Sequence, residues 1–329
     1  MPKPIEPEWK EKFKDVPVPT RINYRLGLSE KWFDFDEPKW DISEQVIIGV
    51  APYGIFIDKE LNPNQPIYPS EIIKEFEECI PLGAVALHTH ARDEKGNISD
   101  PEKACKFLHS VIDPIRAKYG RNVVFDGGIA YYGKTIEDNL FPITEGLYEV
   151  AIINPAIGQM GEWIRVFTPK VIQAQVAYCE AHGVKPLIDI HDTHDIWNAK
   201  KWLIEPGMVS KPTYWHILGP MPGGFIYMPN LESMIEGLLY MVRRIKEIDK
   251  DAVILVTQPA RPSIYFIALA LIMGLHVRVG MEDTIWKYPH KDDLATTNAE
   301  MVKAAVDIAK ALGRRPATAD EYRKIIGIK

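Results

Sequence analysis

The sequence has few cysteines, no long apolar run and no excess of basic residues. Only three of its 329 residues are cysteine, and none forms a Cys-x-x-Cys pair, which indicates buried, reduced thiols. The longest apolar run, Ile264 to Leu275, is too short to cross a bilayer, and the first 15 residues lack the apolar segment of a secretory signal. The formal charge of −6 disfavours nucleic acid or an anionic membrane as the main partner. We therefore expect a cytoplasmic protein that acts on small molecules.

What is present is the composition of an ordinary globular protein, with 46% hydrophobic and 26% charged residues. A chain of this length accommodates either one large α/β barrel or two smaller domains. Residues 1–44 contain several prolines and tryptophans and many charges but no regular alternation of strands and helices. We interpret residues 1–44 as an N-terminal arm that packs on the rest of the protein or on a neighbouring subunit.

From Gln45 onward, short β-branched runs alternate with amphipathic segments, which is typical of βα units around a parallel sheet. The expected strands are Val46 to Val50, Ala84 to Leu87, Val123 to Phe125, Val150 to Ile153, Pro186 to Ile190, Tyr214 to Leu218, Ala252 to Val256 and His276 to Val279. The expected helices are Pro69 to Ile80, Pro101 to Lys118, one from Thr135, Pro169 to His182, one near Trp197, Leu231 to Glu247, Ser263 to Met273 and Ala299 to Leu312. Eight such pairs predict a (β/α)8 TIM barrel over residues 45–329.

Two histidines, His88 and His90, stand at the end of the second expected strand. Side chains two residues apart in a strand point to the same side, so both imidazoles can converge on one ion. Imidazole suits zinc, copper, iron or nickel rather than magnesium or calcium. The alternative is a pair of hydrogen-bonded core histidines.

Two carboxylates, Glu282 and Asp283, follow the eighth expected strand. In a closed barrel this strand is two positions from the second, so Glu282 lies within reach of the histidines. Two histidines and one carboxylate with an open fourth position are typical of a catalytic zinc site. Arg278 points inward from the same strand and needs a carboxylate partner there. The alternative for Glu282 and Asp283 is a solvated loop pair.

Several motifs resemble those of the β-keto acid cleavage enzymes, a family typified by 3-keto-5-aminohexanoate cleavage enzyme. The most specific are His-x-His-x-Arg-Asp at His88 to Asp93 and Arg-Val-Gly-Met-Glu-Asp at Arg278 to Asp283. The resemblance covers roughly Val46 to the C-terminus. Its other motifs are Gly127-Gly128, Lys185-Pro186, Gly219 to Gly224, Asn298 to Gly313 and Pro316-Ala317-Thr318.

The resemblance implies a zinc-dependent barrel enzyme that converts a β-keto acid and acetyl-CoA into acetoacetate and a new acyl-CoA. It implies one zinc ion per subunit held by His88, His90 and Glu282, with Asp283 as the base and Arg278 orienting it. Zinc would acidify the carbon between ketone and carboxylate, so that a carboxylate can remove its proton. The resulting enolate would attack acetyl-CoA, and a retro-Claisen cleavage would follow. The resemblance also implies a homotetramer.

The chain departs from this family before the double glycine, where many relatives carry a small hydroxyl residue and this chain carries Asp126. We hypothesise that Asp126 and the inward-facing Asp189 bind a substrate tail that carries positive charge or hydroxyls, beside Gly127, Gly128 and His191. The alternative is that Asp126 caps the glycine loop.

Other motifs predict different chemistry. Gly128 to Thr135 matches the P-loop pattern of nucleotide triphosphatases, although two tyrosines stand where phosphate wrapping favours small residues. His191 to Asp195 is either a second metal cluster or a helix start capped by Asp192 or Thr193.

A glycine and proline loop, Pro220 to Asn230, offers free amides at Gly223 and Gly224 for an anion such as a CoA phosphate, and Arg261 is expected to reinforce it. Two further alternatives remain for the whole chain. One is an amidohydrolase-like metal hydrolase, whose His-x-His typically ends the first strand. The other is a non-catalytic metal-binding protein without an open coordination position.

Overall fold

The computed structural model describes residues 7–15, 39–128, 135–155, 157–160, 163–219 and 230–328. The chain divides into one unit at Met1–Asp41 and a second at Ile42–Lys329, and each is described by itself. In the first unit the described residues form one helix, α1 (Pro7–Lys12). The division falls close to the predicted boundary at residue 44, and the packing of the arm stays a prediction.

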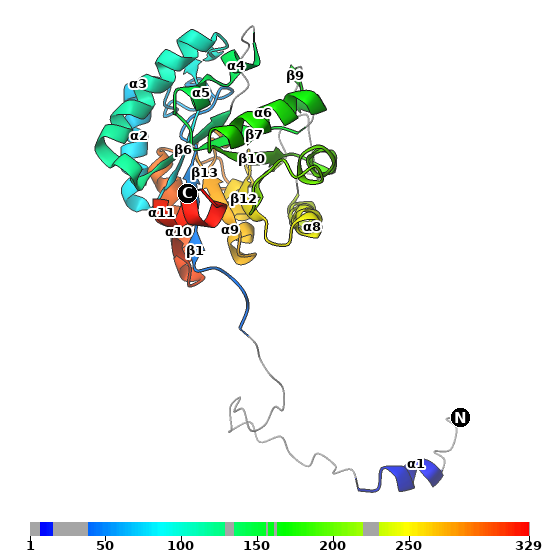
Figure 1. Ribbon diagram of the computed structural model, residues 1–329. Coiled ribbons are helices and arrows are strands. Elements are labelled where there is room, and N and C mark those ends of the chain that lie inside the picture. The colour runs from blue at the N-terminus through cyan, green and yellow to red at the C-terminus, as the bar shows by residue number, and fades with distance from the viewer. Residues whose placement is uncertain are drawn as a thin grey trace. The chain divides into compact units, whose positions relative to one another are not determined.

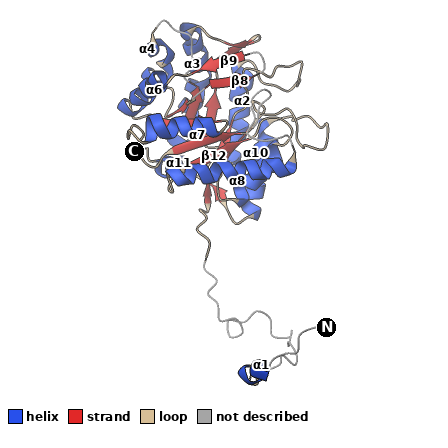
Figure 2. Ribbon diagram, turned by 90° about the vertical axis from the view of Figure 1, so that its right-hand side faces the viewer, coloured by secondary structure: helices blue, strands red, loops and turns tan. Residues whose placement is uncertain are grey.

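The second unit contains eight parallel strands that close into a barrel (Figure 1). In the order in which they pair around the barrel these are β2 (Ile48–Val50), β3 (Ala86–Thr89), β6 (Val124–Gly128), β7 (Val150–Ile153), β10 (Lys185–Ile190), β11 (Tyr214–Leu218), β12 (Val253–Thr257) and β13 (His276–Val279), which pairs with β2. Helices surround these strands (Figure 2). The structure therefore confirms the predicted (β/α)8 TIM barrel.

The helices of this unit follow the strands in the order expected from the sequence. They are α2 (Pro69–Cys79), α3 (Pro101–Tyr119), α4 (Ile136–Asn139), α5 (Phe141–Thr144), α6 (Pro169–Ala181), α7 (Thr193–Ala199), α8 (Leu231–Ile248), α9 (Ser263–Ile272), α10 (Asn298–Ala311) and α11 (Ala319–Ile326), with short 3-10 turns at Ile80–Leu82 and Gly120–Asn122 and a π turn at Lys200–Ile204. None of the helices in the described ranges combines the length and apolarity needed to cross a lipid bilayer.

Local sequence signals explain where several helices begin. Asp100 accepts a hydrogen bond from the backbone amide of Lys103, and a proline occupies the first turn of α3. Thr297 caps α10 in the same way. The single helix expected from Thr135 is instead two short helices, because Pro142 begins a new turn in α5.

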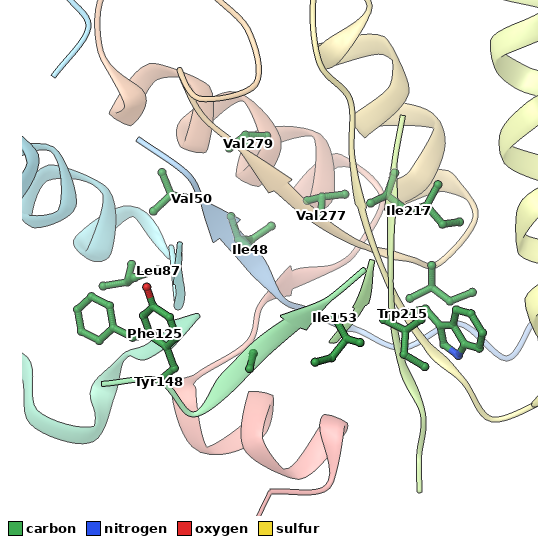
Figure 3. Packing of buried hydrophobic residues seen from close by; sticks show 14 of the residues in the cluster. Ile48, Val50, Leu87, Phe125, Tyr148, Ile153, Trp215, Ile217, Val277 and Val279 are labelled. Carbon is green, nitrogen blue, oxygen red and sulfur yellow. The ribbon is translucent and has the colours of Figure 1, made fainter. Parts of the chain in front are cut away.

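Side chains alternate between two apolar layers along each barrel strand. Ile48, Phe125 and Trp215 point outward into the core between the strands and the helices (Figure 3). Val124 and Tyr214 point inward and belong to a second cluster at the amino ends of the strands. Because this period is two, the residues two positions further along each strand also point inward, toward the carboxyl ends.

Helix α11 closes the amino end of the barrel, and the sequence analysis missed it. Its Tyr322 and Ile326 are buried in the same cluster as the inward-facing strand residues. Thr318 accepts from the amide of Glu321, whose side chain bonds back to the Thr318 amide, so the signal was a capping box. Six short strands complete the described elements: β1 (Gln45–Val46) pairs with β14 (Arg315–Pro316), and the hairpins are β4 (Arg92–Asp93) with β5 (Gly96–Asn97) and β8 (Ile157–Met160) with β9 (Trp163–Val166).

Candidate active site

Two imidazoles and one carboxylate converge at the carboxyl ends of the barrel strands. His88 Nε2 lies 2.9 Å from His90 Nε2, and Glu282 Oε1 lies 3.4 Å and 3.2 Å from these two atoms. In a tetrahedral zinc site with bonds of roughly 2.0–2.1 Å, neighbouring ligand atoms are roughly 3.3 Å apart. The three atoms have the spacing that one zinc ion requires, so the donor set fits that ion.

Glycines allow Glu282 to reach the histidines. A Cβ on Gly54 would lie 2.5 Å from Glu282 Cγ, so only glycine leaves room for this side chain. Gly280 has a φ of 150°, and a Cβ there would lie 2.0 Å from the carbonyl oxygen of Ala51. The loop after β13 therefore packs directly on the loop after β2, and the Glu282 amide donates to the same Ala51 oxygen at 3.1 Å.

Arg278 lies between the two carboxylates and is buried. Its Nη2 donates to Asp283 Oδ1 at 2.9 Å and lies 3.6 Å from Glu282 Oε1. Asp283 Oδ2 and Glu282 Oε2 are buried and have no hydrogen-bond partner among the described residues. The expected pairing of Arg278 with these carboxylates is present, and each carboxylate keeps one oxygen for a ligand or a proton.

The two adjacent carboxylates differ in acidity. Burial raises the pKa of Asp283 to about 6, although Arg278 opposes the shift. Burial also disfavours the charged form of Glu282, but His88, His90 and Arg278 hold its pKa well below the ordinary value. Glu282 therefore keeps the charge that a metal ligand needs, and Asp283 has the higher proton affinity that a base needs.

Asp126 contacts a histidine rather than the cavity. Its Oδ1 lies 2.5 Å from His88 Nδ1, and the two side chains are 3% and 1% exposed. The residues are direct neighbours in the register of β3 and β6. The sequence did not predict this contact, which favours a role for Asp126 beside His88 over the binding of a substrate tail. The reason is that β6 runs to Gly128, so Asp126 is a strand residue with inward parity.

The glycines after Asp126 have different surroundings. A Cβ on Gly127 would lie 2.5 Å from the Tyr148 hydroxyl and 2.6 Å from the Thr89 carbonyl oxygen, so Gly127 permits close packing of β6. Gly128 borders the cavity, and a Cβ there would lie 3.9 Å from His90 Cε1. Residues 129–134 of the P-loop-like pattern lie outside the described residues.

A second polar cluster, formed by Asn154, Asp189, His191 and His216, faces the same cavity. Asp189 Oδ1 lies 2.6 Å from His216 Nδ1, and Asp189 Oδ2 accepts from Asn154 Nδ2 at 2.5 Å and lies 3.6 Å from His191 Nε2. His216 Nε2 lies 2.8 Å from Thr257 Oγ1. Burial opposes ionisation, but His216 keeps the pKa of Asp189 well below its ordinary value.

The sequence analysis missed His216 and Asn154. The signal for His216 was its inward parity on β11, where it is the register partner of Asp189. Asn154 follows β7 directly, a position typical of residues that border a barrel's active site. His191 borders the cavity. Asp192 caps α7 by accepting hydrogen bonds from the amides of His194 and Asp195, which confirms that a capped helix begins in His191 to Asp195.

Of the predicted CoA-binding residues, the structure describes only Arg261. Gly223 and Gly224 lie outside the described residues. Arg261 bonds to the Lys291 carbonyl oxygen at 2.7 Å and to Asp292 Oδ1 at 2.5 Å, and its guanidinium lies 3.7 Å from the centre of the Trp286 ring. Its role in binding CoA stays a prediction.

We call His88, His90 and Glu282, which could hold a metal ion, the metal triad. They share one cavity of about 620 Å³ with Asp283, Arg278 and the polar cluster. This volume is typical of a small-molecule site. Its remaining wall is largely apolar and comes from the loops after β2, β12 and β13, together with Ile152 and Leu218. His88 lies on the second strand of the barrel and His90 directly follows it, which argues against an amidohydrolase, whose pair typically ends the first strand.

The fold and this site define a barrel enzyme with a candidate metal centre at the carboxyl ends of its strands. A family model for the beta-keto acid cleavage enzyme matches residues 45–328. The chain therefore belongs to the β-keto acid cleavage enzyme family and is an enzyme of this class, which decides against the nucleotide triphosphatase, hydrolase and non-catalytic alternatives.

Curated relatives agree with this assignment. The chain is 31% identical over 287 residues to the 3-keto-5-aminohexanoate cleavage enzyme of Fusobacterium nucleatum, covering 87% of this chain and 99% of that protein. It is 25% identical over 307 residues to the 3-dehydrocarnitine:acetyl-CoA trimethylamine transferase of Rhizobium meliloti, covering 86% and 96%. The solved apo structure of ObcA matches with a TM-score of 0.66 at 17% identity, covering 81% of this chain and 66% of ObcA, which supports the barrel fold.

Proposed function

We propose that the protein is a zinc-dependent enzyme that converts a β-keto acid and acetyl-CoA into acetoacetate and a new acyl-CoA. The observation that carries this proposal is the convergence of His88, His90 and Glu282 beside Asp283 in one open cavity. Membership in the family and the acetyl-CoA transferase activity named for one relative support the reaction type.

His88, His90 and Glu282 would hold the zinc ion at the wall of the cavity, and three protein ligands are typical of a catalytic zinc site. When bound, zinc supplies Lewis-acid polarisation of the substrate carbonyl. Asp126 positions His88 through the bond to Nδ1, since a carboxylate on the second ring nitrogen fixes the tautomer that leaves Nε2 free. In this proposal Asp126 is a positioning residue and does not touch the substrate.

Asp283 takes a proton from the carbon between the ketone and the carboxylate of the substrate. Arg278 fixes Asp283 through Oδ1, and Oδ2 remains for the proton. The resulting carbanion attacks the thioester carbonyl of acetyl-CoA, and CoA leaves as the thiolate. The thiolate adds to the original ketone, the bond to the former α-carbon breaks, and the proton returns from Asp283 to give acetoacetate.

The test uses acetyl-CoA labelled with ¹³C in the acetyl group and a panel of β-keto acids. We expect labelled acetoacetate and an unlabelled new acyl-CoA, both detected by mass spectrometry, and about one zinc ion per chain by elemental analysis. His88→Ala should lose the zinc. Release of free CoA and acetate without any new acyl-CoA would identify a hydrolase and contradict the proposal.

A further inference from the structure

The cavity has two chemically different sides. The loops after β2 and β13 contribute Ile55, Ile57, Leu61 and Ile285, which we call the apolar side. These loops are neighbours because β13 pairs with β2 in the barrel. The opposite side carries the polar cluster around Asp189. Glu282 belongs to the same loop as Ile285 and packs on Gly54, so the apolar side begins next to the metal triad.

The carboxylates of the described wall already have a protein partner or a role in the proposed reaction, because the open oxygens of Glu282 and Asp283 belong to the proposed metal ligand and the proposed base. Asp189 uses one oxygen for His216 and the other for Asn154. Arg278 is paired with Asp283 and Glu282, and Glu282 faces both histidines. A cationic tail on the substrate would therefore lose its hydration without gaining a carboxylate of its own.

We propose, as a refinement that rests on the proposed function, that the β-keto acid carries an uncharged alkyl tail and that this tail packs on the apolar side. Alkyl tails gain binding free energy in proportion to the apolar surface that they bury. Each added methylene should raise kcat/KM about fourfold until the apolar side is covered. This differs from the two curated relatives whose names specify an amino and a trimethylamine group.

The apolar side has a second conceivable occupant, the pantetheine arm of acetyl-CoA, and a variant at Leu61 separates the two. Leu61 is 54% exposed, so Leu61→Asp adds a charge to the apolar side without disturbing the core. Ile272→Asp is the matched control, because Ile272 is 58% exposed at the C-terminal end of α9, at the opposite end of the barrel.

The experiment measures kcat/KM for two acids with the same carbon skeleton, 3-oxohexanoate and 3-keto-5-aminohexanoate, with acetyl-CoA as cosubstrate. For the unaltered protein we expect at least a tenfold preference for 3-oxohexanoate. Leu61→Asp should reduce or invert that preference with little change in the KM for acetyl-CoA, and Ile272→Asp should leave both values unchanged.

Three results would overturn the inference. Equal kcat/KM for the two acids, or a preference for 3-keto-5-aminohexanoate, would show that the tail site accepts a cation. A raised KM for acetyl-CoA in Leu61→Asp with unchanged selectivity would assign the apolar side to pantetheine. Formation of acetoacetate from neither acid nor from longer alkyl homologues would instead refute the proposed function, on which the inference rests.

Discussion

The two ends of the barrel use buried charges in opposite ways. At the amino end, Arg314 donates five hydrogen bonds to backbone carbonyl oxygens, those of Ser43, Gln45, Leu271, Gly274 and Leu275. At the carboxyl end, Glu282 and Asp283 each keep one buried oxygen without a hydrogen bond in the described structure. Buried charged residues are therefore saturated with hydrogen bonds at the amino end, whereas those at the carboxyl end keep an oxygen available for a ligand or a proton.

This comparison separates stability from function within one fold. A buried charge whose hydrogen bonds are all made by the protein stabilises the native state, whereas one with an open position is available to a ligand. In barrels of this kind the amino end contributes to stability and the carboxyl end carries chemistry. Substitutions at the carboxyl end should consequently change catalysis, and substitutions at the amino end should change the free energy of unfolding.

The largest expected effect is on catalysis by Asp283→Asn. Asparagine keeps an acceptor for Arg278 but cannot take the substrate proton, so kcat should fall by about 10²- to 10⁴-fold. The measurement is acetoacetate formation together with exchange of the substrate's α-proton in deuterated water. Zinc content and the free energy of unfolding should stay close to those of the unaltered protein.

The matched control for this variant is Asp293→Asn, at an exposed aspartate in the same loop. It should retain full activity. Proton exchange at the original rate in Asp283→Asn would mean that another group is the base.

At the amino end, Arg314→Ala should lower the free energy of unfolding by about 3–5 kcal/mol, because it leaves buried carbonyl oxygens without donors. Activity per folded molecule at 25 °C should not change. Denaturant unfolding monitored by circular dichroism measures the first quantity, and an initial-rate assay measures the second. A large loss of kcat with unchanged stability would contradict the division between the two ends.

Much of both ends was predictable from residue periodicity. The alternation of short apolar runs with amphipathic segments gave all eight strands, because each strand is buried on both faces. The pair His88 and His90 and the pair Glu282 and Asp283 were found because each stands at or just past a strand end. In a parallel barrel such positions meet at one face.

The partners of these residues were not predictable without the register between strands. Asp126 meets His88, and Asp189 meets His216, only because each pair is aligned across neighbouring strands. A shift of one residue would turn one member of each pair outward. The sequence analysis consequently raised only the hypothesis that Asp126 and Asp189 bind the substrate tail, and the contact that each makes with a histidine became visible in the structure.

The third prediction concerns Asp126. Asp126→Ala should weaken zinc affinity about 10- to 100-fold, because His88 loses the group that fixes its ring. Asp126→Asn retains an acceptor and should recover part of this loss. Competition with a chelator measures the affinity directly and does not depend on turnover. Asp93→Ala, at an exposed aspartate of the same motif, is the control, and equal zinc affinities in Asp126→Ala and Asp93→Ala would refute the role of Asp126.

The smallest expected effect is a change in the pH dependence of stability caused by His276→Asn at the amino end. The Nδ1 of His276 accepts from the Ile47 amide at 3.1 Å, and burial, with Arg314 and Lys246 nearby, lowers the pKa of His276 to about 3. The unfolded chain binds this proton at an ordinary pKa of about 6.5, so between pH 6.5 and 3 the unfolded state binds more protons and stability falls as the pH falls. Between pH 7 and 5 this loss amounts to about 2 kcal/mol.

Asparagine can accept the hydrogen bond from the Ile47 amide but does not titrate. Between pH 7 and 5 the free energy of unfolding of His276→Asn should therefore fall by about 2 kcal/mol less than that of the unaltered protein. Denaturant unfolding at the two pH values measures the difference, in which the groups common to both proteins cancel. His276→Ala should show the same weak pH dependence but lower stability at pH 7, because it also loses the hydrogen bond. Equal losses of stability in all three proteins would mean that native His276 takes up its proton between pH 7 and 5, as the unfolded chain does. The amino end, like the carboxyl end, would then hold a group able to change its charge.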